Sequence, residues 1–244
     1  PAVGLLEGTP QVIFPGGDAW LYSFLATREH PPGQPKLLWK FDCNPKTAQW
    51  RSDGRGDRNE LVATPVLWNN RVYIATGQDP QFGEGPAVLW CIDPTHRGDT
   101  SPQIVLDRQG KLVPPRRGQA LDSQAGEQLQ TNPNSAVLWQ YTGQDLNGNG
   151  QQDFEETFHR TIAMPVIADG LLVIGDFAGL VHCLDARTGQ LLWVHDMLAP
   201  IWASPLVADG KIYLADEDGD VVVFALSRQK KILAENQMDQ SVYG

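Results

Sequence analysis

The chain is poor in cysteine, in basic residues and in long apolar runs, and each shortage excludes a class of protein. Its 244 residues include three cysteines, an odd and sparse count that argues against a disulfide-stapled scaffold. Lysine and arginine number 19 against 29 aspartate and glutamate. The resulting net charge of −10 argues against nucleic acid as a partner, because phosphate binding needs a basic face. No run of about eighteen apolar residues is present, so no membrane-spanning helix is predicted.

Motifs of nucleophilic and redox catalysis are also missing from the sequence. There is no Gly-x-Ser-x-Gly elbow and no Cys-x-x-Cys-His haem site, and the five histidines lack the spacing of metal ligands. We therefore predict no catalytic residue. A signal peptide is missing too, but the chain begins with Pro1, which is not an initiator residue. We expect a processed or cut chain that has lost an export signal.

A phrase that occurs twice, forty residues apart, is the strongest signal in the chain. The first copy runs over residues 164–185 and the second over residues 204–225. Each copy joins two β-rich stretches through Asp-Gly, a strong hairpin signal, and a third and a fourth stretch follow. A period of this size predicts one small unit of four antiparallel strands used repeatedly, which is the blade of a β-propeller.

The first half of the chain carries the same phrase with interruptions. Residues 63–74 match the opening hairpin, and residues 12–24 match a second and a third strand, so the first unit is expected to lack its first strand. One position of the fourth strand holds a tryptophan in three units: Trp39, Trp139 and Trp193. We expect these rings to wedge between neighbouring blades, with cofactor stacking as the alternative. Counting from the repeated proline places Leu233 at this position in the last unit.

These repeats resemble a known family. Residues 184–193 read Leu-Asp-Ala-Arg-Thr-Gly-Gln-Leu-Leu-Trp, and residues 204–213 read Ser-Pro-Leu-Val-Ala-Asp-Gly-Lys-Ile-Tyr. Both are similar to the pyrroloquinoline-quinone (PQQ) repeat, and the insertions resemble those of the PQQ-binding-like propellers of planctomycete-type bacteria. That repeat builds quinoprotein dehydrogenases and also non-enzymatic propellers such as the BamB-type scaffold. The resemblance therefore implies a fold and leaves the function open.

The predicted fold class is all-β, a β-propeller of four-stranded antiparallel blades in a single segment over residues 1–244. About four blades are expected, at approximately residues 1–42, 61–142, 161–196 and 201–235. Propellers of the resembled family usually close with seven or eight blades, so the resemblance implies that this chain is part of a larger ring. An open half-ring would leave two exposed strand edges.

Two irregular segments interrupt the blades. Residues 95–135 insert into the second blade and are rich in Gln, Pro, Gly and Asp. A loop of this length is expected either to bind a partner or to be poorly ordered. Residues 43–60 form a second irregular stretch, whose arginines and acidic residues would neutralise one another.

Residues 145–156 match the twelve-residue calcium loop of an EF-hand. The sequence Asp-Leu-Asn-Gly-Asn-Gly-Gln-Gln-Asp-Phe-Glu-Glu places oxygen-bearing side chains at positions one, three, five, nine and twelve, and a glycine at position six. Position seven would contribute a backbone carbonyl, and a hard cation such as Ca²⁺ takes six to eight such oxygens. The predicted metal ligands are Asp145, Asn147, Asn149, Gln151, Asp153 and Glu156. A polar turn without an ion is the alternative, because a strand instead of a helix precedes the loop.

Together these features predict a non-catalytic, exported binding or scaffolding module with a structural Ca²⁺ loop. We expect a protein or polysaccharide partner on the rim loops, and a periplasmic or otherwise extracytoplasmic location. The resemblance implies one alternative, a fragment of a quinoprotein-type, PQQ-dependent oxidoreductase whose other blades would supply the active site. It also argues against bound PQQ, because those enzymes stack the cofactor against two adjacent cysteines, and no two cysteines are adjacent here.

Overall fold

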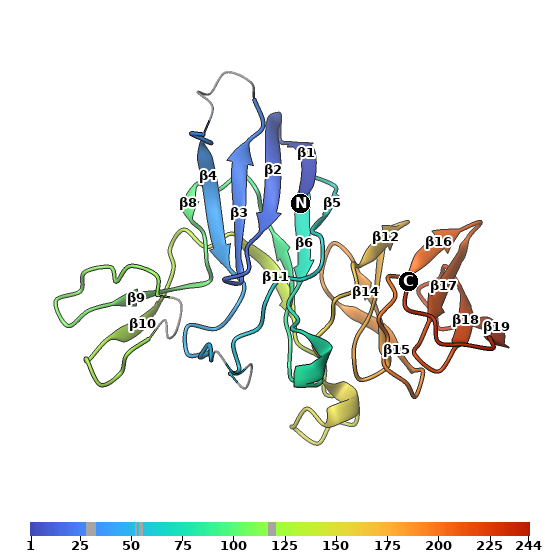
Figure 1. The fold of residues 1–244 in the computed structure, drawn as a ribbon. Helices are drawn as coiled ribbons and strands as arrows, with labels where there is room; N and C mark the ends of the chain where they lie inside the picture. The colour runs from blue at the N-terminus through green and yellow to red at the C-terminus, as the bar shows by residue number, and fades with distance from the viewer. Residues whose placement is uncertain (28–32, 52, 54–55, 117–120) are drawn as a thin grey trace.

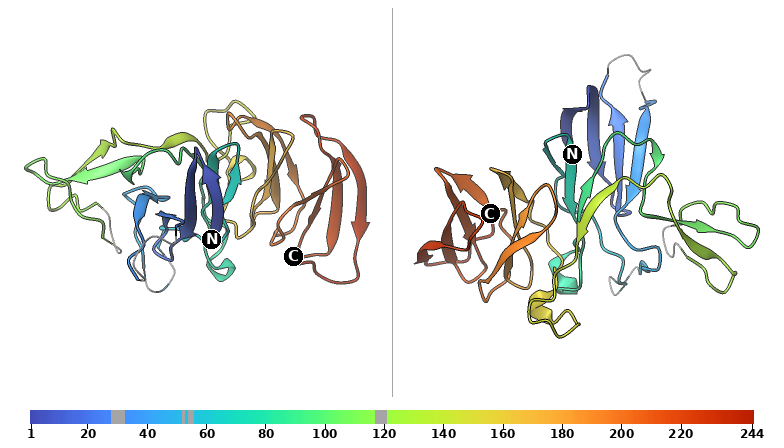
Figure 2. Two further views of the ribbon diagram at one scale, coloured as in Figure 1. Left: turned by 90° about the horizontal axis from the view of Figure 1, so that it is seen from above. Right: turned by 180° about the vertical axis from the view of Figure 1, so that it is seen from behind.

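The computed structural model describes residues 1–27, 33–51, 53, 56–116 and 121–244. Four antiparallel sheets, each built from four successive strands of the repeat, follow one another along the chain, and Figures 1 and 2 show them side by side in chain order. Each sheet is a propeller blade, so the predicted all-β propeller fold is confirmed. The helical elements among the described residues are two single turns of 3₁₀-helix, η1 (Pro80–Phe82) and η2 (Phe154–Glu156).

The four blades share one strand order. The first blade contains β1 (Ala2–Leu6), β2 (Thr9–Pro15), β3 (Trp20–Leu25) and β4 (Leu37–Asp42). The second contains β5 (Val66–Trp68), β6 (Arg71–Ala75), β7 (Leu89–Ile92) and β11 (Val137–Tyr141). The third contains β12 (Val166–Ala168), β13 (Leu171–Gly175), β14 (Leu180–Asp185) and β15 (Leu191–Asp196). The fourth contains β16 (Leu206–Ala208), β17 (Lys211–Ala215), β18 (Asp220–Ala225) and β19 (Ile232–Gln237).

The first two strands of every blade form a tight hairpin. Both turn residues have positive φ in each case, which is the two-residue turn that matches the twist of antiparallel strands. The third and fourth blades use Asp-Gly, whereas the second blade uses Asn69-Asn70 and the first uses Glu7-Gly8. The expectation that the first blade lacks its first strand is therefore wrong. A Glu-Gly pair is a weaker turn signal than Asp-Gly, and it hid the short strand β1.

Three hydrophobic cores lie between the four blades, and each core is built by two successive sheets. The first core joins Ile13, Leu21, Trp39 and Phe41 to Val72, Ile74, Trp90 and Ile92. The second joins Tyr73, Leu89, Trp139 and Tyr141 to Leu172, Ile174 and Leu184. The third joins Val173, Val181, Cys183 and Trp193 to Ile212, Leu214, Val222 and Phe224. Each inner blade thus buries both of its faces, and apolar burial of this kind holds the blades together.

The tryptophans of the fourth strands wedge between blades, as predicted. The indole N–H of Trp139 donates to the Ala186 carbonyl of the next blade, and that of Trp193 donates to Ser227 in the blade after it. The prediction that Leu233 holds this position in the last blade is wrong. The strand register pairs Cys183 with Trp193 but Val223 with Ala234, because the turn before β19 is one residue longer.

The insertion in the second blade leaves the sheet and crosses the first blade. Its strand β8 (Gly98–Asp99) runs parallel to β4 and extends the first sheet at its outer edge. The strands β9 (Gln103–Leu106) and β10 (Gln128–Thr131) then form a hairpin that projects away from the blades (Figures 1 and 2). β8 covers part of an edge that would otherwise be open to pairing with another chain.

Candidate metal site at the rim

The calcium-like loop connects the second blade to the third. It lies at the lower rim, which we define as the end of the blades where second strands turn into third strands and where each blade leads to the next. Figure 1 shows η1 and η2 together at this end. Two backbone hydrogen bonds close the neck of the loop, from Gln144 to the Glu156 carbonyl at 2.9 Å and from Phe158 to the Thr142 carbonyl at 2.9 Å. The neck fixes both ends of the twelve-residue segment.

The oxygen-bearing side chains of the first half of the loop fold back on the loop backbone. The two carboxylate oxygens of Asp145 accept hydrogen bonds from the N–H groups of Gly148 at 2.6 Å and Gly150 at 2.8 Å. Asn147 and Asn149 each accept from the N–H group two residues further on. Local turns of this kind are what Asp and Asn side chains favour, and here they hold the loop compact.

Glu156 at position twelve is the buried member of the loop, with 7% of its surface exposed. One carboxylate oxygen accepts from the N–H groups of Leu146 and Asn147, and the other accepts from the N–H group of Asp153 at 3.2 Å. The carboxylate therefore bridges the two ends of the loop. Asp153 in turn accepts from the side-chain amides of Asn147 at 2.8 Å and Asn149 at 3.0 Å.

The structure thus joins four of the six predicted ligands, Asn147, Asn149, Asp153 and Glu156, through direct hydrogen bonds, whereas Asp145 bonds to the backbone of Gly148 and Gly150. Gln151 is the sixth, and its side chain is exposed, as suits a position that would offer only a backbone carbonyl. Among the described residues, no three His, Cys, Asp or Glu side chains converge closely enough to hold a metal ion in this arrangement. In the loop, the amide N–H groups of Asn147 and Asn149 both point at the Asp153 carboxylate.

A buried polar network lies directly beneath the loop and connects it to the third blade. Asp176 is fully buried and accepts from the backbone N–H of His159 at 3.0 Å. The imidazole of His182 lies 3.0 Å from Asp176 and 3.0 Å from the Tyr141 hydroxyl. A carboxylate accepts only, so Nε2 of His182 donates to Asp176, and Nδ1 of the same ring pairs with the Tyr141 hydroxyl.

Two opposing effects act on the carboxyl group of Asp176. Burial by itself raises its pKa, but the hydrogen bonds from His159 and His182 outweigh burial and lower the pKa to about 2. Asp216 occupies the equivalent turn of the fourth blade and is also fully buried. One of its carboxylate oxygens has no hydrogen-bond partner among the described residues, and burial raises its pKa. The same turn position therefore lowers the pKa of the buried aspartate in the third blade and raises it in the fourth.

Arg160 joins the exit of the loop to the irregular stretch 43–60. Its Nε donates to the Asn59 side chain at 2.8 Å, and its guanidinium also donates to the Phe82 carbonyl in η1. Asn59 exchanges two hydrogen bonds with Asn44, at 3.0 and 2.8 Å. The stretch 43–60 is thus bonded to the lower rim through its amides as well as through its charges.

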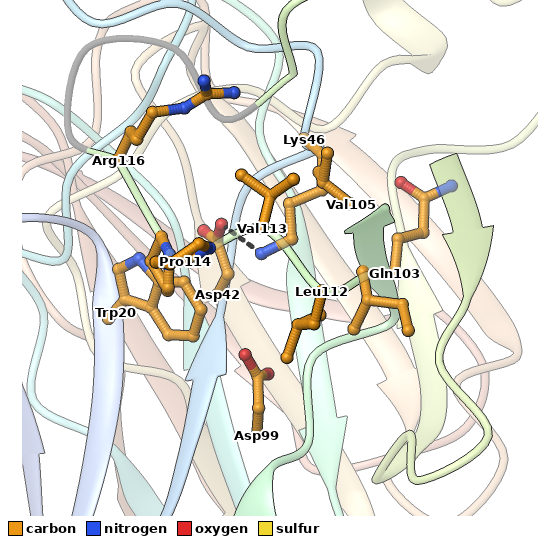
Figure 3. Close-up of a pocket in the computed structure, with 12 residues that line it drawn as sticks. Trp20, Asp42, Lys46, Asp99, Gln103, Val105, Leu112, Val113, Pro114 and Arg116 are labelled. Carbon is orange, nitrogen blue, oxygen red and sulfur yellow. Dashed lines mark hydrogen bonds and ion pairs between the residues drawn. The ribbon is translucent and has the colours of Figure 1, made fainter. Parts of the chain in front are cut away.

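A small pocket lies between the first blade and the insertion, and Figure 3 shows its lining. Its polar side is a buried ion cluster in which Asp42 accepts from Lys46 at 2.7 Å and from Arg58 at 2.7 Å. The Lys46 ammonium also lies 4.4 Å from the centre of the Trp20 ring, within cation–π range. Leu112 and its neighbours in the insertion form the apolar side. The cluster ties the irregular stretch 43–60 to β4, and the insertion is attached beside it, where the Ser101 hydroxyl accepts a hydrogen bond from the Asp42 N–H group at 2.9 Å.

Sequence reasoning missed both buried clusters. The ion cluster in the first blade combines residues from β4 and from the irregular stretch, and no local motif marks it. The network around Asp176 had one visible signal, since Asp recurs at the same turn as Asp216. That signal indicated only a turn, because its histidine partners do not recur in the last blade.

Comparison with known proteins confirms the resemblance to the PQQ-type repeat. The family model described as outer membrane protein assembly factor BamB, a PQQ-type repeat model, matches residues 119–231. An outer membrane protein assembly factor BamB of Legionella pneumophila (strain Paris) is 24% identical over 206 residues, covering 77% of this chain and 51% of the relative. The protein of the same name from Xanthomonas campestris pv. campestris is 23% identical over 227 residues, covering 90% of this chain and 47% of the relative. The chain spans about half the length of these relatives.

The fold is also similar to a solved propeller of another family. The C-terminal WD40 domain of Sif2 matches 98% of this chain and 48% of that domain, with a TM-score of 0.53 and 12% identity. This likeness concerns the fold alone. The matches to BamB confirm the resemblance to PQQ-like, BamB-type propellers. The structure confirms the blade architecture. Within the residues that the structure describes, no helix is long and apolar enough to cross a bilayer.

Proposed function

We propose that this PQQ-like propeller is a non-catalytic scaffold that works outside the cytoplasm and binds a protein partner through its lower rim. The observation that carries the proposal is where the reactive side chains lie. Asp176, His182 and Tyr141 are buried, and their side chains form a hydrogen-bonded chain with one another. The three cysteines are buried as well, and burial raises the pKa of each thiol. Groups held in this way support the packing of blades and do not meet a substrate.

The lower rim presents what a binding surface needs. Its loops expose large apolar side chains, namely Phe82, Leu146, Phe154, Met164 and Leu198. Leu198 is 87% exposed and has a φ of +67°, a strained conformation for leucine. Exposed apolar side chains on loops that a rigid scaffold holds are typical of protein-binding sites. The relatives carry the name of outer membrane protein assembly factors, which supports a protein partner in an extracytoplasmic compartment.

A photo-crosslinking experiment tests the partner. The chain is exported to the periplasm of a Gram-negative host with p-benzoylphenylalanine replacing Leu198, and a matched control carries the same group in place of Leu129 on the projecting hairpin. We expect a discrete protein adduct from the first position alone. Adducts of equal strength from both positions would contradict binding at the rim. An adduct whose added mass is left intact by protease and is removed by glycosidases would identify a polysaccharide partner instead.

A second test addresses catalysis. The alternative reading, a quinoprotein-type oxidoreductase fragment, predicts that the chain binds PQQ in the presence of Ca²⁺ and then oxidises alcohols with a dye as electron acceptor. The scaffold proposal predicts neither the absorption of a bound quinone nor dye reduction above a control without protein. Dye-linked turnover would overturn the scaffold proposal.

We further propose that Ca²⁺ binds the loop 145–156 and stiffens the link between the second and third blades. The donor set is chemically suited to this ion, because it combines carboxylates of Asp145, Asp153 and Glu156 with amide and backbone oxygens. None of these carboxylates has a Lys or Arg ion-pair partner among the described residues. The amide N–H groups that face Asp153 supply partial positive charge where a cation would supply a full one. Binding requires those two amides to turn their oxygens inward.

Calorimetry and thermal unfolding test the ion site. Loops of this class in extracellular modules bind Ca²⁺ with dissociation constants of about 10⁻⁴ to 10⁻³ M. With a constant of about 1 mM, about 10 mM Ca²⁺ stabilises the folded state by about 1.4 kcal/mol, which raises the Tm by about 3–5 °C. Glu156→Gln should abolish the shift, whereas Glu155→Gln, an exposed neighbour outside the cluster, should keep it. A wild type without binding heat or Tm shift would discard the site.

A further inference from the structure

The insertion in the second blade and the irregular stretch 43–60 together build a pocket against the second blade. Residues 44–46 of the stretch, residues 102, 103 and 131 of the insertion, and four residues in or next to β7 and β11 line a pocket of about 400 Å³. Pockets of about 300–1,000 Å³ are of the size that holds small ligands. Lys46 and Gln103 separate this pocket from the small pocket of Figure 3, because both residues line both pockets.

Hydrogen bonds within the protein fix the walls of this pocket. The indole N–H of Trp90 donates to the Cys43 carbonyl at 2.9 Å, which holds the irregular stretch against the second blade. In the insertion, the buried side chain of Asn132 donates to the Ser101 carbonyl at 2.9 Å, and the backbone N–H of Asn132 donates to the Pro102 carbonyl at 3.0 Å. The pocket is therefore formed before a ligand arrives, as is usual for small-molecule sites.

The charged group and the buried amide at the pocket already have partners. Lys46 is the one charged residue among the described residues of the lining, and its ammonium lies 2.7 Å from the Asp42 carboxylate. The side chain of Asn44 uses both its N–H group and its oxygen on the backbone of Asn59. The pocket thus offers no unpaired charge to a ligand, which favours an uncharged one.

Four other polar side chains of the lining have no hydrogen-bond partner among the described residues. They are Gln103 and Thr131 of the insertion, and Gln140 and Thr142 of the second blade. Each amide and each hydroxyl can both donate and accept a hydrogen bond. Ligand hydroxyl groups match such side chains, because a hydroxyl also donates and accepts at one atom.

The remaining lining is apolar. It consists of Pro45, Val88, Trp90 and Pro102, and the indole N–H of Trp90 is occupied by its bond to Cys43. A saccharide ring combines apolar C–H faces with hydroxyl groups around its edge, so it matches both parts of this lining. An extended peptide separates its donors from its acceptors and binds by preference along a strand edge. A saccharide therefore fits this lining better than a peptide.

We propose that this pocket binds an uncharged saccharide unit. The C–H face of the sugar packs on the apolar residues, and its hydroxyl groups bond to the two glutamines and the two threonines. The insertion then has a role, because it supplies one wall of the site. None of the exposed apolar side chains of the lower rim lines this pocket, so the inference stands or fails independently of the scaffold proposal.

Saturation-transfer NMR and calorimetry with maltose, cellobiose and N,N′-diacetylchitobiose at millimolar concentration test the site. We expect at least one of these sugars to bind. Gln103→Leu and Gln140→Leu each remove a polar group that makes no hydrogen bond within the described protein. Each should weaken binding about two- to tenfold, which is the worth of one hydrogen bond. Gln128→Leu makes the same change on β10 outside the lining and should leave the affinity unchanged.

Three outcomes would overturn the proposal. The first is a wild type that binds none of the three sugars. The second is sugar binding that keeps its full strength in both Gln103→Leu and Gln140→Leu, because the sugar then sits elsewhere. The third is a blocked peptide, acetyl-trialanine amide, that binds more tightly than the sugars, since the pocket would then be a peptide site. Circular dichroism of each variant checks that the blades remain folded, and Leu198→Asp on the lower rim should keep sugar binding.

Discussion

Asp176 and Asp216 provide a matched pair of mutations, because they hold the same turn in successive blades and are both fully buried. Asp176→Asn is expected to destabilise the protein strongly. One oxygen of its carboxylate accepts hydrogen bonds from the backbone N–H group of His159 and from the imidazole of His182. The other oxygen accepts from two further backbone N–H groups. An asparagine amide would turn a donor toward groups that already donate. Asp216→Asn replaces a carboxylate of which one oxygen has no partner.

The pKa of Asp176 sets the size of the effect. Its value of about 2 in the folded protein lies below the 3.8 of an unperturbed aspartate. Because one pKa unit corresponds to 1.36 kcal/mol, the ionised form contributes about 2–3 kcal/mol of stability. In a chain of this length the loss corresponds to a fall in Tm of about 5–10 °C. For Asp216, whose pKa is raised by burial, the ionised form opposes folding, so its replacement should cause no loss or a small gain.

Unfolding curves measured from pH 7 to pH 2 test both signs. A folded pKa below the unfolded one gives stability that is present above about pH 4 and is lost as the pH falls toward 2. Wild type and Asp216→Asn should show that loss, whereas Asp176→Asn should begin at the lower stability and change less over the same range. Equal destabilisation by the two substitutions at pH 7 would refute the reasoning, and so would an Asp176→Asn variant as stable as the wild type.

Three further predictions concern the cores between blades. Gly189→Ala should lower the free energy of unfolding by more than about 2 kcal/mol, because the residue has a φ of +73° and its new Cβ would lie 2.6 Å from the Trp139 ring. Gly210→Ala is the control, since Gly210 has a similar φ but open space around it, and it should cost about 1 kcal/mol in the same denaturant titrations. Phe158→Ala should cost about 3–5 kcal/mol, since the side chain is fully buried in the second core, and a loss below 1 kcal/mol in the same assay would contradict that packing. The three buried thiols should stay unreactive toward a thiol reagent in the native protein and react together on unfolding. The reason is that burial shields them and raises their pKa, which for Cys91 is about 11. Rapid labelling of the native protein would show that a blade opens.

The candidate site was accessible to sequence reasoning because all of its predicted ligands lie within twelve residues. A contiguous motif fixes its own geometry through local turns, as the hydrogen bonds of Asp145, Asn147 and Asn149 show. The surroundings of the site were not accessible. Asp176, His159 and Tyr141 belong to three different segments, and they meet only because the second and third blades pack against each other.

The sequence was sufficient to predict the blade, because strand alternation, Asp-Gly turns and a forty-residue repeat are short-range properties that each segment expresses on its own. It also determined the wedge positions of Trp139 and Trp193. The packed structure was needed to show that β1 completes the first blade and that Ala234 ends the tryptophan series. These outcomes depend on turn lengths, strand register and which surfaces touch. Such quantities are set by the packing of distant segments, which no local pattern encodes.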